Sequence, residues 1–164
     1  MSENTPSTTR RLVERWIDAW NGRDLDVLKE IFHPEFTWHI AVTEPGNPQM
    51  RDLQSDLLRG KNLPWEKAIY NKDETIAIFS TIFDTAAEFH IEPHAFIEDG
   101  DRIAVELVGN AYTEEGGRQY NNLYCHVFTV RDGQILLFRE YQDTLLLFDV
   151  WTGLDPSAQA AFED

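Results

Sequence analysis

Length, composition and charge limit the classes of protein that this sequence can encode. Its 164 residues suffice for one domain with a sizeable core, and a formal net charge of −15 argues against nucleic acid or an anionic membrane as a partner. No run approaches the ~20 apolar residues of a membrane helix. The single cysteine, Cys125, fits a reducing compartment. We therefore expect a cytoplasmic protein with one domain over 1–153 and an acidic, frayed tail over 154–164.

Two helices and a strand are predicted at the beginning of the chain. Apolar residues recur at helical spacing over 12–20, and Asn21-Gly22 can end this helix because both residues tolerate the left-handed conformation. A second helix is predicted over 24–32, beginning at an aspartate cap, and Pro34 stops it. Apolar residues alternate over 36–42, which predicts a strand.

The segment 44–72 is the least regular part of the sequence. Prolines and glycines interrupt it, and structureless connections of this length usually have a function. We interpret it as a lid or rim over a cleft. An arm that contacts a second copy of the chain is the alternative.

The second half of the chain is predicted to supply most of a sheet. A third helix over about 73–87 is followed by strands over 89–97 and 102–113 and by a hairpin over 119–143. One sheet with helices packed on one face is the α+β arrangement that follows from this order. A sheet that curves strongly over its helices leaves a cavity at its open end.

The hairpin turn decides which side chains share a face. If residues 131–133 form a three-residue loop with a bulge, Tyr124 lies opposite Glu140 and His126 opposite Phe138. If Asp132-Gly133 is instead a two-residue turn, His126 faces Arg139. We prefer the bulged loop, because it gathers Tyr124, His126 and Glu140 into one cluster.

Two stretches of the sequence resemble a known family. Residues 13–38, with W-I-D-A-W-N-G-R-D-L and F-H-P-E-F-T-W, resemble the amino-terminal helices and first strand of the ketosteroid isomerase-like superfamily. Residues 120–144, with Y-C-H-V-F-T-V-R-D-G and R-E-Y-Q-D, resemble its last hairpin. The superfamily also contains nuclear transport factor two, SnoaL-like polyketide cyclases, limonene epoxide hydrolase and phenazine-biosynthesis proteins.

The resemblance implies a fold and an assembly. The fold is a cone-shaped α+β barrel, in which a curved antiparallel or mixed sheet wraps around three helices from the first half of the chain and encloses a cavity. Members are commonly homodimers through the outer face of the sheet. Because this fold hosts several chemistries and some pure binders, it does not by itself specify a reaction.

The catalytic residues of known family members can be compared one at a time with the matching positions of this sequence, and the comparison excludes some reactions. The tyrosine donor and the two aspartates of steroid isomerases fall at Trp16, at about Ile40 and at about His126, which argues against a steroid isomerase. The strand 105–111 lacks the arginine–aspartate pair of limonene epoxide hydrolase. The remaining aspartate of that enzyme, and a glutamate of the phenazine-type proteins, correspond to Glu140.

Three side chains are candidate catalytic groups. A desolvated Glu140 carboxyl would have a raised pKa suited to proton transfer, whereas an ion-paired or rim glutamate would not. His126 is a candidate partner acid or base, or a core histidine. Tyr124 could donate to a developing oxyanion, or simply line the cavity.

A second set of residues is predicted to bind the substrate and exclude water. Most are apolar or aromatic, and Asn122 is a candidate hydrogen-bonding group. The set is Trp16, Trp20, Trp38, Ile40, Phe79, Phe83, Asn122 and Phe138. No spacing of histidines predicts a metal site, since Pro93 separates His90 from His94 on a strand, and we expect no cofactor.

The function expected from these features is cofactor-independent acid/base catalysis. The reaction would be an isomerisation, a dehydration or an aldol-type cyclisation of a small apolar carbonyl or hydroxy compound. The alternative is a non-catalytic ligand-binding or dimerisation module of the same fold. Epoxide hydrolysis is a third, less favoured possibility.

Overall fold

The computed structural model describes residues 6–40, 69–113, 118–144, 146–147 and 150. Within these residues three helices and a six-stranded sheet form the α+β fold that the sequence predicts. The larger part of the segment interpreted as a lid, 41–68, and the predicted tail, 154–164, lie outside the described residues. None of the described helices is long and apolar enough to cross a membrane.

The helices begin at polar caps. Helix α1 (Thr8–Asn21) starts after Ser7, whose hydroxyl accepts a hydrogen bond from a backbone N–H, and α2 (Leu25–Ile31) starts after Asp24. Helix α4 (Lys72–Thr85) begins slightly before the predicted position, because Asn71 and Glu74 form a capping box. The first two helices are therefore confirmed, and the third is confirmed with an earlier start.

The sheet is mixed. Its strands lie in the order β2-β1-β6-β5-β4-β3, with β1 parallel to β6 and all other neighbours antiparallel. The strands are β1 (Phe32–Ile40), β2 (Ile69–Asn71), β3 (Ala86–Asp99), β4 (Arg102–Thr113), β5 (Gln119–Arg131) and β6 (Gln134–Gln142). Strand β2 was not predicted. The irregular segment therefore ends in an edge strand that pairs with β1.

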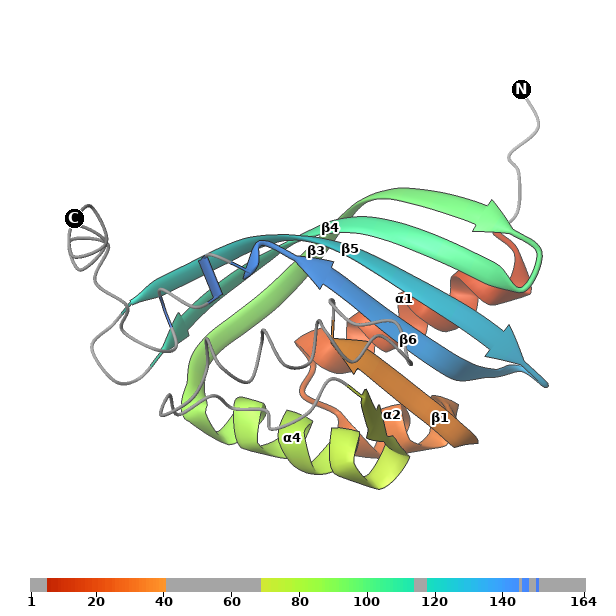
Figure 1. Ribbon diagram of the computed structural model, residues 1–164, viewed down its shortest axis with the longest axis horizontal. Helices are drawn as coiled ribbons and strands as arrows, with labels where there is room; N and C mark the ends of the chain where they lie inside the picture. Colours follow the sequence, from red (N-terminus) through yellow and green to blue (C-terminus); the bar gives the residue numbers. More distant parts are fainter. Residues whose placement is uncertain (1–5, 41–68, 114–117, 145, 148–149, 151–164) are drawn as a thin grey trace, which may run out of the picture.

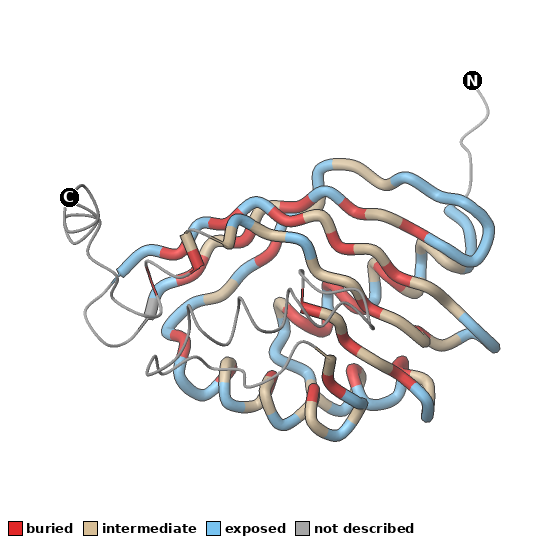
Figure 2. The backbone as a smooth tube through the Cα atoms, in the orientation of Figure 1, coloured by how far each residue is buried: buried red, intermediate tan, exposed pale blue. Residues whose placement is uncertain are grey.

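The sheet arches over the helices and is not closed, since β2 and β3 remain as its two edges (Figure 1). Buried residues alternate with exposed or half-buried ones along β4 and β5, which gives the sheet one buried and one exposed face (Figure 2). Helices α1 and α4 pack their apolar stripes, which include Trp16, Trp20 and Phe79, against that buried face.

The hairpin between β5 and β6 has a two-residue turn, so the predicted three-residue loop is wrong. Asp132 and Gly133 both have positive φ angles, 54° and 76°, and Arg131 pairs with Gln134. These are the angles of a type I′ turn, whose twist matches the twist of the flanking strands.

A bulge in β6 nevertheless places Glu140 on the same face as Tyr124 and His126, as the three-residue loop had predicted. The register shifts between Thr129, which pairs with Leu137, and Val130, which pairs with Ile135, so that Leu136 is the extra residue. His126 consequently lies opposite Glu140, and Tyr124 lies two residues away from its predicted partner, opposite Gln142. The grouping of Tyr124, His126 and Glu140 on one face is confirmed, and their individual pairings are corrected.

Gly109 of β4 allows two aromatic rings to lie against the sheet. A Cβ atom built at Gly109 would be 2.6 Å from Cε2 of Tyr124 and 3.3 Å from Cε2 of Phe89. The absence of a side chain at this position therefore sets where the ring of Tyr124 lies.

We expect Gly109→Ala to destabilise the fold by roughly 1–3 kcal/mol, because the added methyl group must displace Tyr124 from a packed position. Urea unfolding measures the change. Ala104→Val, which adds methyl groups to an outward-facing position of the same strand, is the control and should stay within about 0.5 kcal/mol of wild type. Equal effects of the two substitutions would contradict the close approach at Gly109.

Candidate active site

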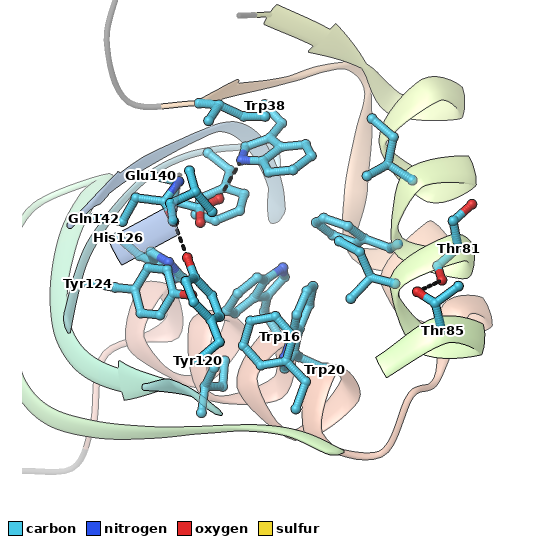
Figure 3. Close-up of a pocket in the computed structure, with 18 residues that line it drawn as sticks. Trp16, Trp20, Trp38, Thr81, Thr85, Tyr120, Tyr124, His126, Glu140 and Gln142 are labelled. Atoms are coloured by element: carbon cyan, nitrogen blue, oxygen red, sulfur yellow. Dashed lines mark hydrogen bonds between the residues drawn. The ribbon is translucent and has the colours of Figure 1, made fainter. Parts of the chain in front are cut away.

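A cavity of about 170 Å3 lies between the buried face of the sheet and helices α1 and α4. Glu140, Gln142, His126 and Tyr124 lie on one side of it, and Thr81 and Thr85 of α4 lie on the other (Figure 3). Most of its wall is aromatic or aliphatic. The described residues that line it are Trp16, Trp20, Trp38, Ile40, Ile78, Phe79, Thr81, Ile82, Thr85, Phe89, Ile91, Tyr120, Tyr124, His126, Phe138, Glu140, Gln142 and Leu147.

The cavity brings together nine of the eleven side chains predicted for the site. They are Trp16, Trp20, Trp38, Ile40, Phe79, Tyr124, His126, Phe138 and Glu140. Asn122 and Phe83 are not among the lining residues. The ring of Phe83 packs edge to face against Trp20, with centroids 5.1 Å apart, so it supports the wall from behind.

The carboxyl group of Glu140 is the one acidic group among the described residues that line the cavity. Nε1–H of Trp38 donates a hydrogen bond of 3.0 Å to its Oε2 atom, and no salt bridge to Glu140 is formed within the described residues. Burial raises the pKa of Glu140 from its ordinary 4.5 to about 7, while the hydrogen bond from Trp38 acts in the opposite direction. The ion-paired alternative is thus not what the structure shows.

Parallel pairing of β1 with β6 places the indole of Trp38 beside Glu140. Trp38 pairs with Phe138 and Ile40 pairs with Glu140, so both strands point these side chains toward the same face. The rings of Trp38 and Phe138 are stacked with an interplanar angle of 7° and centroids 6.1 Å apart. This stacking limits the rotation of the indole and keeps its N–H directed at the carboxyl group.

His126 lies in a nearly closed aromatic environment. Its side chain is 4% exposed, and its ring centroid is 5.5 Å from Trp16, 5.0 Å from Tyr124 and 4.8 Å from Phe138. Burial lowers the pKa of His126 to about 3, so the imidazole is neutral near pH 7. Neither ring nitrogen has a hydrogen-bond partner within the described residues. A neutral imidazole can donate or accept a hydrogen bond, but it does not act there as a cationic acid.

A polar network lies at the end of the cavity formed by β5 and β6. The hydroxyl of Tyr120 donates to Oε1 of Gln142 at 2.9 Å and accepts from Nδ2 of Asn122 at 2.7 Å. Burial raises the pKa of Tyr124, and its hydrogen bond with Tyr120 raises it further. Sequence reasoning missed both Tyr120 and Gln142 as site residues. Extending the two-residue alternation by one step along each strand would have found them.

Asn122 is fully buried behind this network. Its Nδ2 donates to Tyr120 and to the carbonyl oxygen of Asp143 at 3.1 Å, while its Oδ1 accepts from the backbone N–H of Asp143 at 2.9 Å. All of these partners belong to the protein. The predicted role of Asn122 as a direct substrate contact is therefore replaced by one of holding Tyr120 and the end of β6.

The part of the chain that the structure describes contains no cluster of metal-ligating side chains. No group of three or more histidine, cysteine, aspartate or glutamate side chains there lies close enough to hold an ion.

The raised pKa of Glu140 predicts a specific dependence of stability on pH. The folded protein holds this proton up to about pH 7, whereas the unfolded chain loses it near 4.5. The stabilisation from the neutral carboxyl is thus complete below pH 4.5 and is lost as the pH rises to about 7, by at most about 3 kcal/mol. The Glu140→Gln variant cannot ionise at this position. The free energy of unfolding of the variant, minus that of wild type, should therefore increase between pH 5 and pH 8.

Urea unfolding of both proteins across this pH range measures the gain. Glu88→Gln, at an exposed position of edge strand β3, is the matched control and should follow wild type. A difference between Glu140→Gln and wild type that does not change with pH would mean that the carboxyl group titrates normally.

Comparison with known proteins places this architecture in a family. A family model described as the SnoaL-like domain matches residues 13–138. A search of curated proteins gave no significant match to the sequence.

Three solved structures illustrate the similarity. An NTF2-like protein of unknown function from Burkholderia pseudomallei is 24% identical, with a TM-score of 0.68, over 90% of this chain and 99% of that one. TerC, co-crystallised with polyporic acid, is 18% identical with a TM-score of 0.67, over 90% and 99% of the two chains. A limonene epoxide hydrolase-like enzyme from M. tuberculosis is 19% identical with a TM-score of 0.62, over 88% and 89%.

At these identities the solved structures establish the fold alone. The family model, in contrast, matches more than half of the sequence, from within α1 to within β6, and ends before Glu140. The chain belongs to the SnoaL-like family.

Proposed function

We propose that this protein is a cofactor-independent enzyme that uses Glu140 to transfer protons on a small, mainly apolar carbonyl or hydroxy compound. The observation that carries the proposal is a carboxyl group inside an aromatic cavity, with a pKa of about 7 and one oxygen held by Trp38. At neutral pH both the acid and the carboxylate are populated, so the same group can accept a proton and return it.

The remaining polar groups have supporting roles in this proposal. His126 is neutral and orients the substrate by hydrogen bonding, which replaces its predicted alternative role as an acid. Tyr124 is hydrogen bonded to Tyr120 and forms part of the polar end of the cavity. Trp16, Trp38 and Phe138 form apolar walls that exclude water from the reacting atoms.

The lining favours a neutral organic substrate. No lysine or arginine lies among the described lining residues, so a substrate carboxylate would meet Glu140 without a compensating cation. The cavity is also smaller than the roughly 300 Å3 at which ligand sites typically begin, which suits a compound of one or two rings. The TerC complex with polyporic acid supports the binding of a small organic molecule by this fold.

The reactions under consideration share one chemical step. In isomerisation, dehydration and aldol-type cyclisation of a carbonyl compound, a base removes a proton from the carbon next to the carbonyl group. The carbon–hydrogen bond breaks, an O–H bond forms on Glu140, and the electron pair moves onto the carbonyl oxygen. Epoxide hydrolysis is less favoured, because β4 lacks the arginine–aspartate pair of the limonene epoxide hydrolases.

We expect the protein to accelerate hydrogen–deuterium exchange at the carbon between the ring and the carbonyl group of 2-tetralone in D2O, measured by proton NMR. Because the carboxylate form is the base, the rate should rise with pH and level off above about pH 7. Glu140→Gln should lower the catalysed rate by at least ~100-fold, whereas Glu88→Gln should leave it unchanged. Equal rates for wild type and Glu140→Gln would favour the alternative, a non-catalytic ligand-binding module of the same fold.

We also propose that the protein forms a homodimer through the outer face of the sheet. The exposed large hydrophobic residues of the described structure are Leu123, Tyr141, Ile97 and Tyr112, with exposed fractions of 70%, 48%, 62% and 39%. By strand alternation and pairing, all four lie on the face opposite the cavity. Large exposed apolar side chains that share one face of a sheet support an interaction surface there.

Analytical ultracentrifugation tests this assembly. Leu123→Lys places a charge at the centre of the patch and should convert a dimer into monomers without lowering the melting temperature of the monomer. Asp84→Lys on the exposed side of α4 should not change the sedimentation coefficient. A monomeric wild type would contradict the proposed dimer.

A further inference from the structure

Gln142 lines the site, but it was not predicted from the sequence and has no role in the proposed mechanism. It lies two residues after Glu140 on β6, directly opposite Tyr124, and its side chain lines the cavity. Glu140 and Gln142 are consecutive inward positions of the strand, so their Cα atoms are roughly 6.6 Å apart. The question is which end of the carboxamide faces the cavity.

Hydrogen bonds that begin at the backbone fix the orientation of Asn122. The N–H group of Asp143 donates to Oδ1 of Asn122 at 2.9 Å. A backbone N–H can only donate, so this contact identifies the oxygen of the Asn122 carboxamide. Its nitrogen is then the atom that donates to the hydroxyl of Tyr120 at 2.7 Å and to the carbonyl of Asp143 at 3.1 Å.

The hydroxyl group of Tyr120 connects Asn122 to Gln142 and determines the orientation of the Gln142 carboxamide. The hydroxyl oxygen accepts a hydrogen bond from Nδ2 of Asn122 at 2.7 Å. Asn122 can only donate to this oxygen, so the proton of the Tyr120 hydroxyl is directed to a different group that accepts it. That acceptor is Oε1 of Gln142, at 2.9 Å.

The nitrogen of the Gln142 carboxamide is left for the cavity. A carboxamide has two N–H donors at the end opposite its oxygen, and Nε2 of Gln142 has no hydrogen-bond partner among the described residues. An oriented donor thus lies beside a proton-transfer group, on the same face of the same strand. Such a pair matches a carbonyl oxygen and the proton-bearing carbon next to it.

We infer that Nε2 of Gln142 donates a hydrogen bond to the carbonyl oxygen of a neutral, enolisable ketone, and that Asn122 and Tyr120 hold the carboxamide in the orientation that allows it. When Glu140 removes the proton from the adjacent carbon, the negative charge develops on the oxygen that Gln142 binds. Assignment of the chemical step rests on the proposed function. The hydrogen bond itself does not, because it forms in the bound ketone before any reaction.

Infrared difference spectroscopy of bound 2-tetralone, prepared with a 13C-labelled carbonyl group, tests this hydrogen bond directly. In wild type the carbonyl stretch should lie at lower frequency than it does in an aprotic apolar solvent. Gln142→Met preserves the length of the side chain, removes the donor and should abolish most of that shift. It should also weaken 2-tetralone binding by roughly 3- to 10-fold, while binding of tetralin, which lacks the oxygen, should not change.

In Gln142→Met the hydroxyl of Tyr120 loses its acceptor and could itself donate to the ketone. A second pair of variants controls for this possibility. The double variant Tyr120→Phe with Gln142→Met is compared with Tyr120→Phe alone, so that no phenol at position 120 can replace the missing donor. The frequency shift should be smaller in the double variant. Thermal unfolding of each protein identifies the variants that remain folded under the conditions of measurement.

The inference is overturned if the carbonyl shift is absent in wild type or is retained when Gln142 is replaced. It is also overturned if 2-tetralone binds no more tightly than tetralin, including the case in which neither binds. These outcomes are separate from the proposed function. A retained carbonyl shift without Glu140-dependent deuterium exchange would leave Gln142 as a ligand-binding group and would refute the enzyme.

Discussion

The hydrogen bond from Trp38 to Glu140 is the contact on which the rest of the site depends. It joins the first strand of the chain to the last, and it exists because β1 lies parallel to β6 in a sheet that is otherwise antiparallel. The indole supplies one N–H without a charge. The carboxyl group is therefore positioned, yet it is not neutralised by an ion pair, and its pKa stays near 7. An arginine in the same place would hold the group ionised and unable to take part as an acid.

Several polar groups of the interior are buried around the cavity. Within the described residues, the indole nitrogens of Trp16 and Trp20 and both nitrogens of His126 are buried without hydrogen-bond partners. Each such group is typically destabilising by about 1–3 kcal/mol. Glu140 adds a carboxyl whose ionised form is disfavoured, and His126 an imidazole whose protonated form is disfavoured. Polar groups retained at this cost, all around one cavity, are typical of a functional site.

Support for the site comes from residues that do not touch the cavity. Asn122 binds backbone and phenol groups and so orders the polar end of the site, and Gly109 leaves room for the rings of Tyr124 and Phe89. The bulge at Leu136 has a comparable effect on the opposite strand, since it places Glu140 and Gln142 on the inward face. The rigid scaffold thus determines the geometry of the cavity, and the carboxyl group of Glu140 is positioned by few direct contacts.

Periodicity and turn chemistry in the sequence were enough to predict the helices, most strands, the α+β class and the aromatic composition of the cavity. These features depend on local spacing, because the alternation of side chains in a strand and their recurrence in a helix are properties of neighbouring residues. The same alternation placed Tyr124, His126 and Glu140 on one face. Only the tertiary structure decided which residues meet across strands. The turn at Asp132-Gly133 alone would have placed Arg139 opposite His126, and the bulge that reversed this has no local signature in the sequence. The partner of Glu140 comes from a strand 102 residues earlier, and the pKa of His126 is lowered by burial among rings that α1, β5 and β6 bring together. Pairings of this range depend on the packing of the whole sheet, which no short stretch of the chain specifies.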